Sequence, residues 1–332
     1  MTSSPLRRAL QERRFVVAPG IFDMISAKVA DGMGFAALYV TGFGTVASHL
    51  GLPDAGIATY TDMLSRVRTF AAGCRTPIIA DADTGYGGLL NVRHTVAGYE
   101  AAGVAGIQLE DQETPKKCGH TPGRRVIPAE EMALKVRVAA ETRRNPDFLI
   151  VARTDARTAH GLEEAIRRGR LYAEAGADVV FIESPETEAE MAEIGRSVGK
   201  PLLANMVEGG RTPILPAERL AELGYAIAIY PAVGFLAAAA ALERAYDHRE
   251  GDALRRAHGA ELELVAREGE GRRAVAVGVV LLDLGELGHA EVDELLRGVL
   301  PARGAGDDVV DHAGERLPHE HRDDRRGRLV RA

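Results

Sequence analysis

The sequence predicts an α/β protein, a (β/α)8 TIM barrel followed by a C-terminal helical or disordered extension. Short apolar runs alternate with longer amphipathic stretches from residue 15 to residue 246. The runs number eight, and they are apolar on both faces, as the strands of a buried parallel sheet are. Eight strand and helix units in this length fit a closed barrel better than an open doubly wound sheet.

The predicted strands and helices alternate in the order that a barrel requires. The strand candidates are FVVAPG (15–20), AALYVTG (36–42), TPIIADADTG (76–85), VAGIQLED (104–111), FLIVARTDA (148–156), DVVFIES (178–184), PLLANM (201–206) and AIAIYPA (226–232). The helical patterns between them include TDMLSRVRTFAAG (61–73), PAEEMALKVRVAAETRRN (128–145), GLEEAIRRGRLYAEAG (161–176) and AERLAELG (217–224). Several of these stretches end in a glycine, which is expected just past a helix C-terminus.

The composition indicates a globular protein that acts on small molecules. Hydrophobic residues make up 46% of the 332 residues and charged residues 27%, as in soluble domains. The net charge of -7 gives no general attraction to nucleic acid or to an anionic membrane. No signal-peptide pattern and no charge-free apolar run of about 18 residues occurs, so we expect no membrane span. Two cysteines, Cys74 and Cys118, make no disulfide framework, and we expect a reducing, cytoplasmic setting.

Residues 1–247 are predicted to form the catalytic barrel, and residues 248–332 an atypical tail. All 16 aromatic residues lie at or before Tyr246, whereas six of the ten histidines follow Asp247. This composition is typical of a solvated or disordered segment, with a weak helical pattern in AEVDELLRGVL. A further hypothesis is that part of the tail is translated out of frame. GC-rich DNA that is read in a shifted frame encodes mainly Arg, Ala, Gly, Val and Asp. Resequencing the gene tests it.

Polar residues stand at the C-terminal ends of consecutive predicted strands. They are Thr41, Asp81 with Asp83, Glu110 with Asp111, Arg153 with Asp155, Glu183 and Asn205. Each one taken singly could cap the helix that follows it. In a βα barrel, however, the C-terminal ends of the strands converge on one face, where active sites are built. We therefore predict that these residues share one site.

The stretch DADTGYGG (81–88) predicts a metal site. Asp81 and Asp83 are two residues apart, so along a strand they would point to the same face. Glu110 from the next strand and Asp54 from the loop GLPDAG would join them, and these carboxylates would repel one another unless a cation lay among them. Oxygen ligands without a Cys or His cage favour Mg²⁺, with Mn²⁺ as a substitute. The alternative is a cluster of helix caps and salt bridges.

Two further features predict carboxylate binding. Arg153 can bind a carboxylate with two parallel hydrogen bonds, a geometry that lysine does not offer. Thr41, Gly42 and Phe43 bring backbone N–H groups and a hydroxyl close to the start of a helix, which is a natural cradle for an anion. Phe43 taken alone is better explained as a loop residue that packs against its own barrel.

The run KKCGH, residues 116–120, combines two cations, a thiol, a glycine and an imidazole. A cysteine beside Lys and His can have a lowered pKa and take part in catalysis, but most cysteines are inert. The residues alone leave three interpretations open: a reactive cysteine, half of a metal site, or an ordinary polar loop.

Seven motifs, taken together and in order, give the chain a specific resemblance. They are YVTGFGTVASHLGLPDAG (39–56), DADTGYGG (81–88), GIQLEDQ (106–112), KKCGH (116–120), ARTDA (152–156), FIESP (181–185) and ANMVEGG (204–210). From Phe15 to Tyr246 the chain resembles the isocitrate lyase and phosphoenolpyruvate mutase superfamily. In that superfamily KKCGH marks the carbon–carbon lyases of the 2-methylisocitrate lyase and 2,3-dimethylmalate lyase type, which implies that Cys118 is catalytic.

The resemblance implies a Mg²⁺-dependent lyase that cleaves a 2-hydroxy di- or tricarboxylate by a retro-aldol reaction into pyruvate or glyoxylate and a smaller acid. Asp81 and Asp83 would hold the metal, with Asp54 and Glu110 around it. Loss of the hydroxyl proton would expel the neighbouring carbon as an enediolate, and Cys118 would protonate it. An ordinary thiol is largely protonated at neutral pH, which suits this role.

The resemblance also assigns the other site residues. The catalytic set would be Cys118, His120, Arg153, Lys116 and Lys117. The ketoacid would bind at Thr41, Gly42, Phe43, Asp81 and Arg153, and the leaving acid at Gly119, His120, Glu183 and Asn205. The cations of KKCGH would stabilise the thiolate and the leaving carboxylates, in a loop that closes over the substrate.

Two departures from the family pattern bear on these expectations. Thr41, Gly42 and Phe43 stand where 2-methylisocitrate lyases have Ser-Gly-Gly, which leaves the substrate open. The tail does not resemble the C-terminal helices through which the family's tetramers assemble, so we expect a homo-oligomer, the family tetramer, if the tail permits it. The rival hypotheses are a phosphonomutase or phosphonopyruvate-type enzyme on the same barrel and a catalytically impaired protein with a damaged C-terminus.

Overall fold

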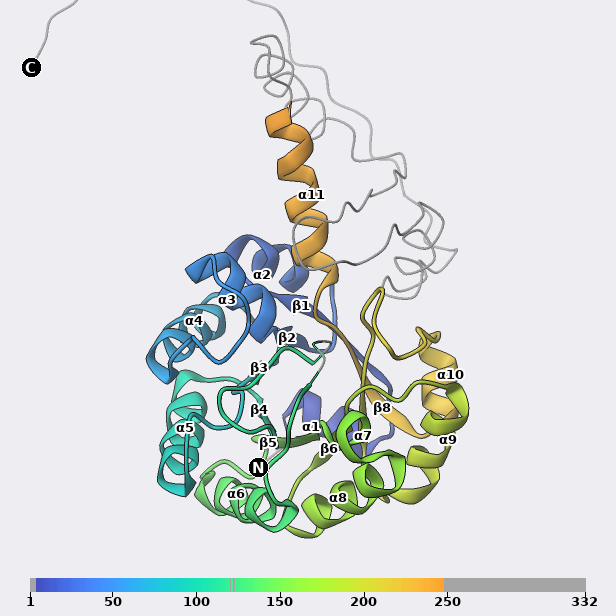
Figure 1. The fold of residues 1–332 in the computed structure, drawn as a ribbon. Coiled ribbons are helices and arrows are strands. Elements are labelled where there is room, and N and C mark those ends of the chain that lie inside the picture. The colour runs from blue at the N-terminus through green and yellow to red at the C-terminus, as the bar shows by residue number, and fades with distance from the viewer. Residues whose placement is uncertain (1–3, 120, 122, 248–332) are drawn as a thin grey trace, which may run out of the picture. The chain divides into compact units, whose positions relative to one another are not determined.

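The computed structural model describes residues 4–119, 121 and 123–247, which form the predicted (β/α)8 barrel (Figure 1). Its parallel strands are β1 (Val16–Ile21), β2 (Leu38–Val40), β3 (Ile78–Asp81), β4 (Gly106–Glu110), β5 (Leu149–Thr154), β6 (Val179–Ile182), β7 (Leu202–Asn205) and β8 (Tyr225–Tyr230). Each strand pairs with the next along the chain, and β1 also pairs with β8, so the sheet closes on itself without an open edge. The eight predicted strands are confirmed, whereas the predicted tail, residues 248–332, lies outside the described residues.

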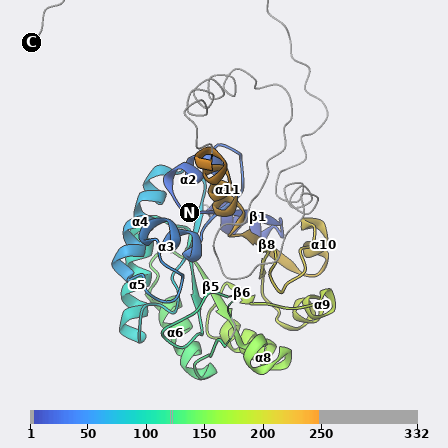
Figure 2. The same cartoon turned by 45° about the horizontal axis from the view of Figure 1, so that its top comes forward.

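Helices surround the strands, as Figures 1 and 2 show. They are α1 (Pro5–Gln11), α2 (Met24–Asp31), α3 (Gly42–Leu50), α4 (Tyr60–Gly73), α5 (Leu89–Ala102), α6 (Ala129–Thr142), α7 (Ala156–His160), α8 (Leu162–Glu174), α9 (Glu188–Ser197), α10 (Ala217–Glu222) and α11 (Val233–Asp247). In the described part of the chain, no helix is long and apolar enough to cross a membrane.

Helix α4 illustrates how the sequence specifies these elements. Thr59 caps its first turn and forms a reciprocal capping box with Asp62. Met63, Val67 and Phe70 recur at helical spacing, and all three are buried against the barrel. The helix therefore forms because its cap and its apolar face agree.

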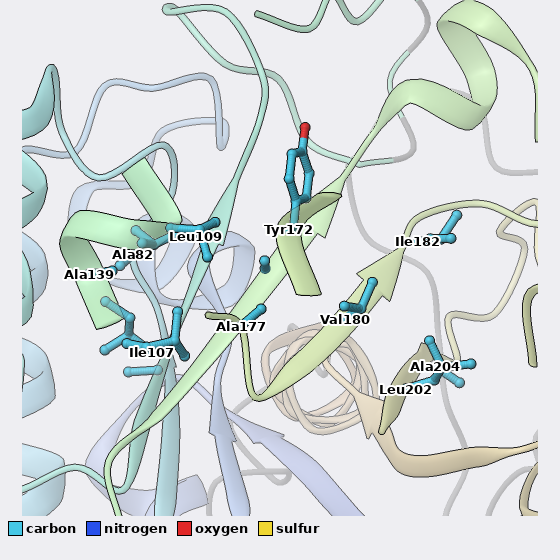
Figure 3. Close-up of a cluster of buried hydrophobic side chains, with 14 of the residues drawn as sticks. Ala82, Ile107, Leu109, Ala139, Tyr172, Ala177, Val180, Ile182, Leu202 and Ala204 are labelled. Carbon is cyan, nitrogen blue, oxygen red and sulfur yellow. The ribbon is translucent and has the colours of Figure 1, made fainter. Parts of the chain in front are cut away.

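Two apolar layers stabilise the barrel. The outer layer lies between the strands and the helices, where Figure 3 shows Ile107 of β4, Val180 of β6 and Leu202 of β7 together with Ala139 of α6 and Tyr172 of α8. The strands are buried on both faces, which explains why their sequences are apolar throughout.

The inner layer fills the barrel itself and continues onto α1. Val16, Ile79 and Val151 from the strands form one cluster with Leu6 and Ala9 of α1. Since α1 precedes β1, it covers the N-terminal ends of the strands, and the opposite face is left for a functional site.

We expect Phe70→Ala to lower the free energy of unfolding by about 3–5 kcal/mol, because Phe70 is fully buried and its removal leaves a cavity. Urea denaturation followed by circular dichroism measures the change. Leu90→Ala is the matched control, because Leu90 is 81% exposed, and its effect should stay within about 0.5 kcal/mol. Equal effects of the two substitutions would contradict the described packing of α4.

Candidate active site

Asp111 was predicted to share one site with the other strand-end residues, but its carboxylate accepts hydrogen bonds from Arg168 and Tyr172 of the outer helix α8. The other polar residues predicted at the strand ends lie together at the C-terminal mouth of the barrel. They are Thr41, Asp81, Asp83, Glu110, Arg153, Asp155, Glu183 and Asn205, and none of them is more than 9% exposed. Carboxylates, an arginine and an amide are seldom buried unless they are paired or serve a function. The mouth is therefore the candidate active site.

Lys116 joins the predicted metal ligands on one side of the mouth. Its Nζ lies 2.5 Å from Asp54 Oδ1 and 2.6 Å from Asp83 Oδ1. The backbone N–H of Asp83 donates a 3.0 Å hydrogen bond to Asp81 Oδ1. The structure thus brings together Asp54, Asp81 and Asp83 and adds an ammonium group to them.

The prediction that Asp81 and Asp83 point to the same face of one strand was wrong. Strand β3 ends at Asp81, and Asp83 lies beyond it with a φ of 47°. A non-glycine residue in this left-handed region is uncommon, costs about 1–3 kcal/mol and often marks a functional site. A tight turn, which continues through Gly85 at a φ of 83°, therefore brings Asp83 back to Asp81.

Burial opposes the ionisation of these carboxylates in spite of the cations beside them. Burial, together with Asp81 and Asp54, raises the pKa of Asp83 to about 7 in spite of Lys116. Burial also raises the pKa of Asp81, and that of Glu110 well above the ordinary value. Burial alone would lower the pKa of Lys116, but Asp83, Asp54 and Glu110 raise it well above its usual range, so the ammonium stays charged.

The donor chemistry of this cluster fits a hard divalent cation. Glu110 Oε1 is buried without a hydrogen-bond partner among the described residues. A β-carbon on Gly42 would lie 2.6 Å from Asp81 Oδ2, so glycine leaves this oxygen accessible to the backbone and to small groups. No three His, Cys, Asp or Glu side chains form a ready-made metal cluster within the described ranges. Lys116 instead lies between two of the predicted ligands.

Arg153 lies at the centre of the other side of the mouth. Its Nε and Nη2 donate hydrogen bonds of 2.9 Å each to Asp155. Glu110 Oε2 lies 3.5 Å from Nε and Glu183 Oε2 3.4 Å from Nη2, and Asn205 Nδ2 donates to Glu183 at 3.1 Å. Arg153 is therefore oriented by its neighbours and keeps its charge.

The loop that carries KKCGH reaches this arginine. A β-carbon on Gly119 would lie 2.5 Å from Arg153 Nη2 and 3.2 Å from Glu183 Oε2, so the Gly119 backbone lies directly against both side chains. The adjacent Cys118 is half-buried. The side-chain amide of Gln112 binds the backbone of Lys117. It accepts a hydrogen bond from the Lys117 N–H at 3.0 Å and donates one to the Lys117 carbonyl at 2.9 Å. His120 lies outside the described residues.

The segment Thr41 to Phe43 begins α3, as the cradle prediction requires. Thr41 caps this helix, since its hydroxyl accepts a hydrogen bond from the N–H of Gly44 at 3.4 Å. The half-buried Phe43 packs edge-to-face against Phe235, with ring centroids 5.3 Å apart. Phe43 therefore packs against its own barrel through α11.

The structure gives Asp155 a contact that the sequence did not predict, and it adds Arg124 to the mouth. Asp155 orients Arg153. Arg124, in the segment 123–127 that follows KKCGH and leads back to the barrel, pairs with the same carboxylate. The ARTDA motif contains Asp155, but nothing local indicates which basic residue would reach it. A cavity of about 370 Å³ also opens beside Asp83 and Lys116, and it gives space for small molecules next to the cluster.

Comparison with known proteins agrees with this geometry. The family model described as phosphoenolpyruvate phosphomutase matches residues 6–249. The chain is 52% identical to 2,3-dimethylmalate lyase of Eubacterium barkeri, over 73% of this chain and 83% of the relative. It is 44% identical to 2-methylisocitrate lyase of Aeropyrum pernix, over 72% and 76% respectively.

Solved structures give the same assignment. A crystal structure of 2,3-dimethylmalate lyase, described as a PEP mutase/isocitrate lyase superfamily member, matches with a TM-score of 0.71 and 36% identity, over 84% of this chain and 100% of that chain. Phosphonopyruvate hydrolase in complex with oxalate and Mg²⁺ matches with a TM-score of 0.66 and 29% identity, over 80% and 98%. The chain belongs to the PEP mutase/isocitrate lyase superfamily, as its motifs predicted.

We expect Mg²⁺ to bind the cluster more weakly at about pH 5.5 than at about pH 8, by up to tenfold for each pH unit below the pKa of Asp83. The folded-state pKa of about 7 lies above the unfolded value of 3.8. The proton on Asp83 therefore stabilises the metal-free fold at low pH, and this contribution is lost as the pH rises through 7. Titration calorimetry at both pH values measures the affinity.

The matched variant is Asp83→Asn, which keeps the shape of the side chain and cannot ionise. It should bind Mg²⁺ weakly at both pH values and lose most of the pH dependence. Equal Mg²⁺ affinity of the unmodified protein at the two pH values would contradict the role of Asp83.

Proposed function

We propose that this carbon–carbon lyase cleaves a 2-hydroxy di- or tricarboxylate, of the 2,3-dimethylmalate or 2-methylisocitrate type, into pyruvate or glyoxylate and a smaller acid. The position of KKCGH carries the proposal, because Gly119 lies against Arg153 and Glu183 and thereby places the adjacent Cys118 at the barrel mouth. The names of the relatives at 52% and 44% identity support the substrate class.

The ketoacid half of the substrate binds where the mouth offers its carboxylate-binding groups. Arg153, held by Asp155, presents its guanidinium group to the substrate carboxylate. The first backbone N–H groups of α3, at Gly42 and Phe43, supply a second set of donors beside Asp81. The substrate is thus oriented before any bond breaks.

Cleavage is a retro-aldol reaction. The substrate hydroxyl gives its proton to a carboxylate of the barrel mouth, its oxygen forms the new carbonyl, and the bond between the carbinol carbon and its neighbour breaks. The electron pair of that bond leaves as an enediolate on the smaller acid, and the Cys118 thiol protonates the carbon. Lys116, Lys117 and His120 stabilise the resulting thiolate and the leaving carboxylate.

Mg²⁺, or Mn²⁺ in its place, is the proposed cofactor, and when bound it polarises the hydroxyl and carboxylate oxygens of the substrate. Asp81 and Asp83 would hold it, with Asp54 and Glu110 around them. The burial of these carboxylates, which raises the pKa of Asp83 and of Glu110, supports this assignment. The Mg²⁺ complex of the related phosphonopyruvate hydrolase supports it too. The leaving acid meets Gly119, His120, Glu183 and Asn205.

We expect Cys118→Ser to lower kcat by a factor of about 100 or more, because a hydroxyl is a far weaker acid than a thiol. Release of ketoacid from a panel of 2,3-dimethylmalate, 2-methylisocitrate, citramalate and oxaloacetate measures the rate. The fold and the affinity for Mg²⁺ should not change.

Cys74→Ser is the control, because Cys74 follows α4 on the side away from the mouth and its thiol contacts Ala27 O at 3.8 Å. It should retain full activity. Unchanged turnover in Cys118→Ser would refute the role of the thiol, and activity on phosphonopyruvate or phosphoenolpyruvate instead of these acids would favour the phosphonate alternative.

We further propose that the protein acts in the cytoplasm as a homotetramer. An apolar stripe on and just after α2 supports self-association, since Ile25, Val29 and Met33 are 76%, 61% and 42% exposed. Light scattering should give about four times the mass of one chain, as expected for closed symmetric assembly. A monomer that does not respond to Mg²⁺ would contradict this proposal and favour a protein impaired by its tail.

A further inference from the structure

Arg124 lies on the arm that returns from KKCGH to the barrel, and its side chain is buried in the mouth. The segment that contains Arg124 runs antiparallel to the segment that leads into KKCGH. Gln112 forms an antiparallel bridge with Val126, and the N–H of Ile127 donates a 2.8 Å hydrogen bond to Asp111 O. Arg124 is 7% exposed, whereas the side chain of the following Arg125 is 78% exposed. Of two adjacent arginines, one therefore points into the site and the other into solvent.

Arg124 connects the loop to the ends of two strands. Its Nη1 pairs with Asp155 Oδ1, just beyond β5. Its Nη2 donates to Ser184 Oγ at 3.3 Å, and Ser184 in turn donates to Glu183 Oε1 at 3.1 Å. The guanidinium group of Arg124 thus contacts Asp155, which binds Arg153, and Ser184, which binds the neighbouring Glu183.

Asp155 transmits the effect of Arg124 to Arg153. The same Oδ1 atom that accepts from Arg124 also accepts from Arg153 Nη2 at 2.9 Å, and Oδ2 accepts from Arg153 Nε at 2.9 Å. Asp155 is completely buried, so water does not replace a lost partner. The position of this carboxylate therefore depends on both arginines.

Arg124 also offsets charge that would otherwise restrain Arg153. Glu110, Asp155 and Glu183 all lie within 3.5 Å of the Arg153 guanidinium group. With Arg124 present, Asp155 divides its attraction between two cations. Without it, Asp155 would bind Arg153 alone and draw it away from an incoming carboxylate.

We infer that Arg124 is a positioning residue, which fixes Arg153 through Asp155 and couples the placement of the KKCGH loop to carboxylate binding. The inference rests on the proposed function, in which Arg153 binds a carboxylate of the substrate. Arg124 itself contacts no reacting atom.

Three variants test the inference, with oxalate as the probe and titration calorimetry in Mg²⁺ as the measurement. Arg124→Met should weaken oxalate binding by about tenfold or more and raise KM by a similar factor, because loss of a buried charge partner displaces Arg153. Arg124→Lys keeps the positive charge but not both hydrogen bonds of the guanidinium group, so it should weaken oxalate binding less than Arg124→Met does. Arg125→Met alters the same arm without a buried contact and should have no effect, as expected for an exposed ion pair.

Circular dichroism and thermal denaturation establish that each variant is folded. If Arg124→Met does not fold, Ser184→Ala removes one hydrogen bond of Arg124 and should weaken oxalate binding by about threefold. Unchanged oxalate affinity in Arg124→Met, or an equal loss in Arg125→Met, overturns the inference.

The two proposals fail in different ways. A protein that binds oxalate, shows the Arg124 effect and cleaves none of the 2-hydroxy acids contradicts the proposed function and supports the inference. A protein that binds no oxalate in Mg²⁺ overturns both, because Arg153 then holds no carboxylate.

Discussion

Buried negative charge at the barrel mouth determines how the rest of the site is arranged. Carboxylates from several strand ends lie close together and are almost completely buried, and each resists ionisation unless a cation is near. Lys116 comes to one group of them from the loop, and Arg153 lies within the other. The positions of these cations, and the raised pKa of Asp83, follow from this one electrostatic constraint.

The closed barrel makes such a concentration of charge possible. Apolar layers inside and outside the strands, together with the cap formed by α1, supply the stability that offsets the cost of burying ionised groups. Parallel strands then place their C-terminal residues on one face, whatever their separation in sequence. The candidate site is thereby confined to one end of the barrel.

The KKCGH loop belongs to the site through backbone contacts as much as through side chains. Gly119 approaches Arg153 and Glu183 more closely than any residue with a β-carbon could, and Gln112 fixes Lys117 by its backbone. Lys116 enters the acidic cluster from the same loop. A change in the position of the loop would consequently alter both halves of the site at once.

The sequence alone determined the eight strands, several of the helices between them and most of the strand-end residues of the site, because apolar periodicity and polar ends are local properties that a single chain displays. The motifs determined the superfamily in the same way. Only the tertiary structure decided that Asp83 reaches Asp81 by a left-handed turn, that Lys116 lies between Asp54 and Asp83, and that Arg124 rather than Arg125 meets Asp155. The turn at Asp83 depends on a left-handed backbone conformation that an aspartate seldom adopts. The other two pairings depend on distances between segments far apart in the chain, and such distances are fixed when the barrel closes and the loop packs across it.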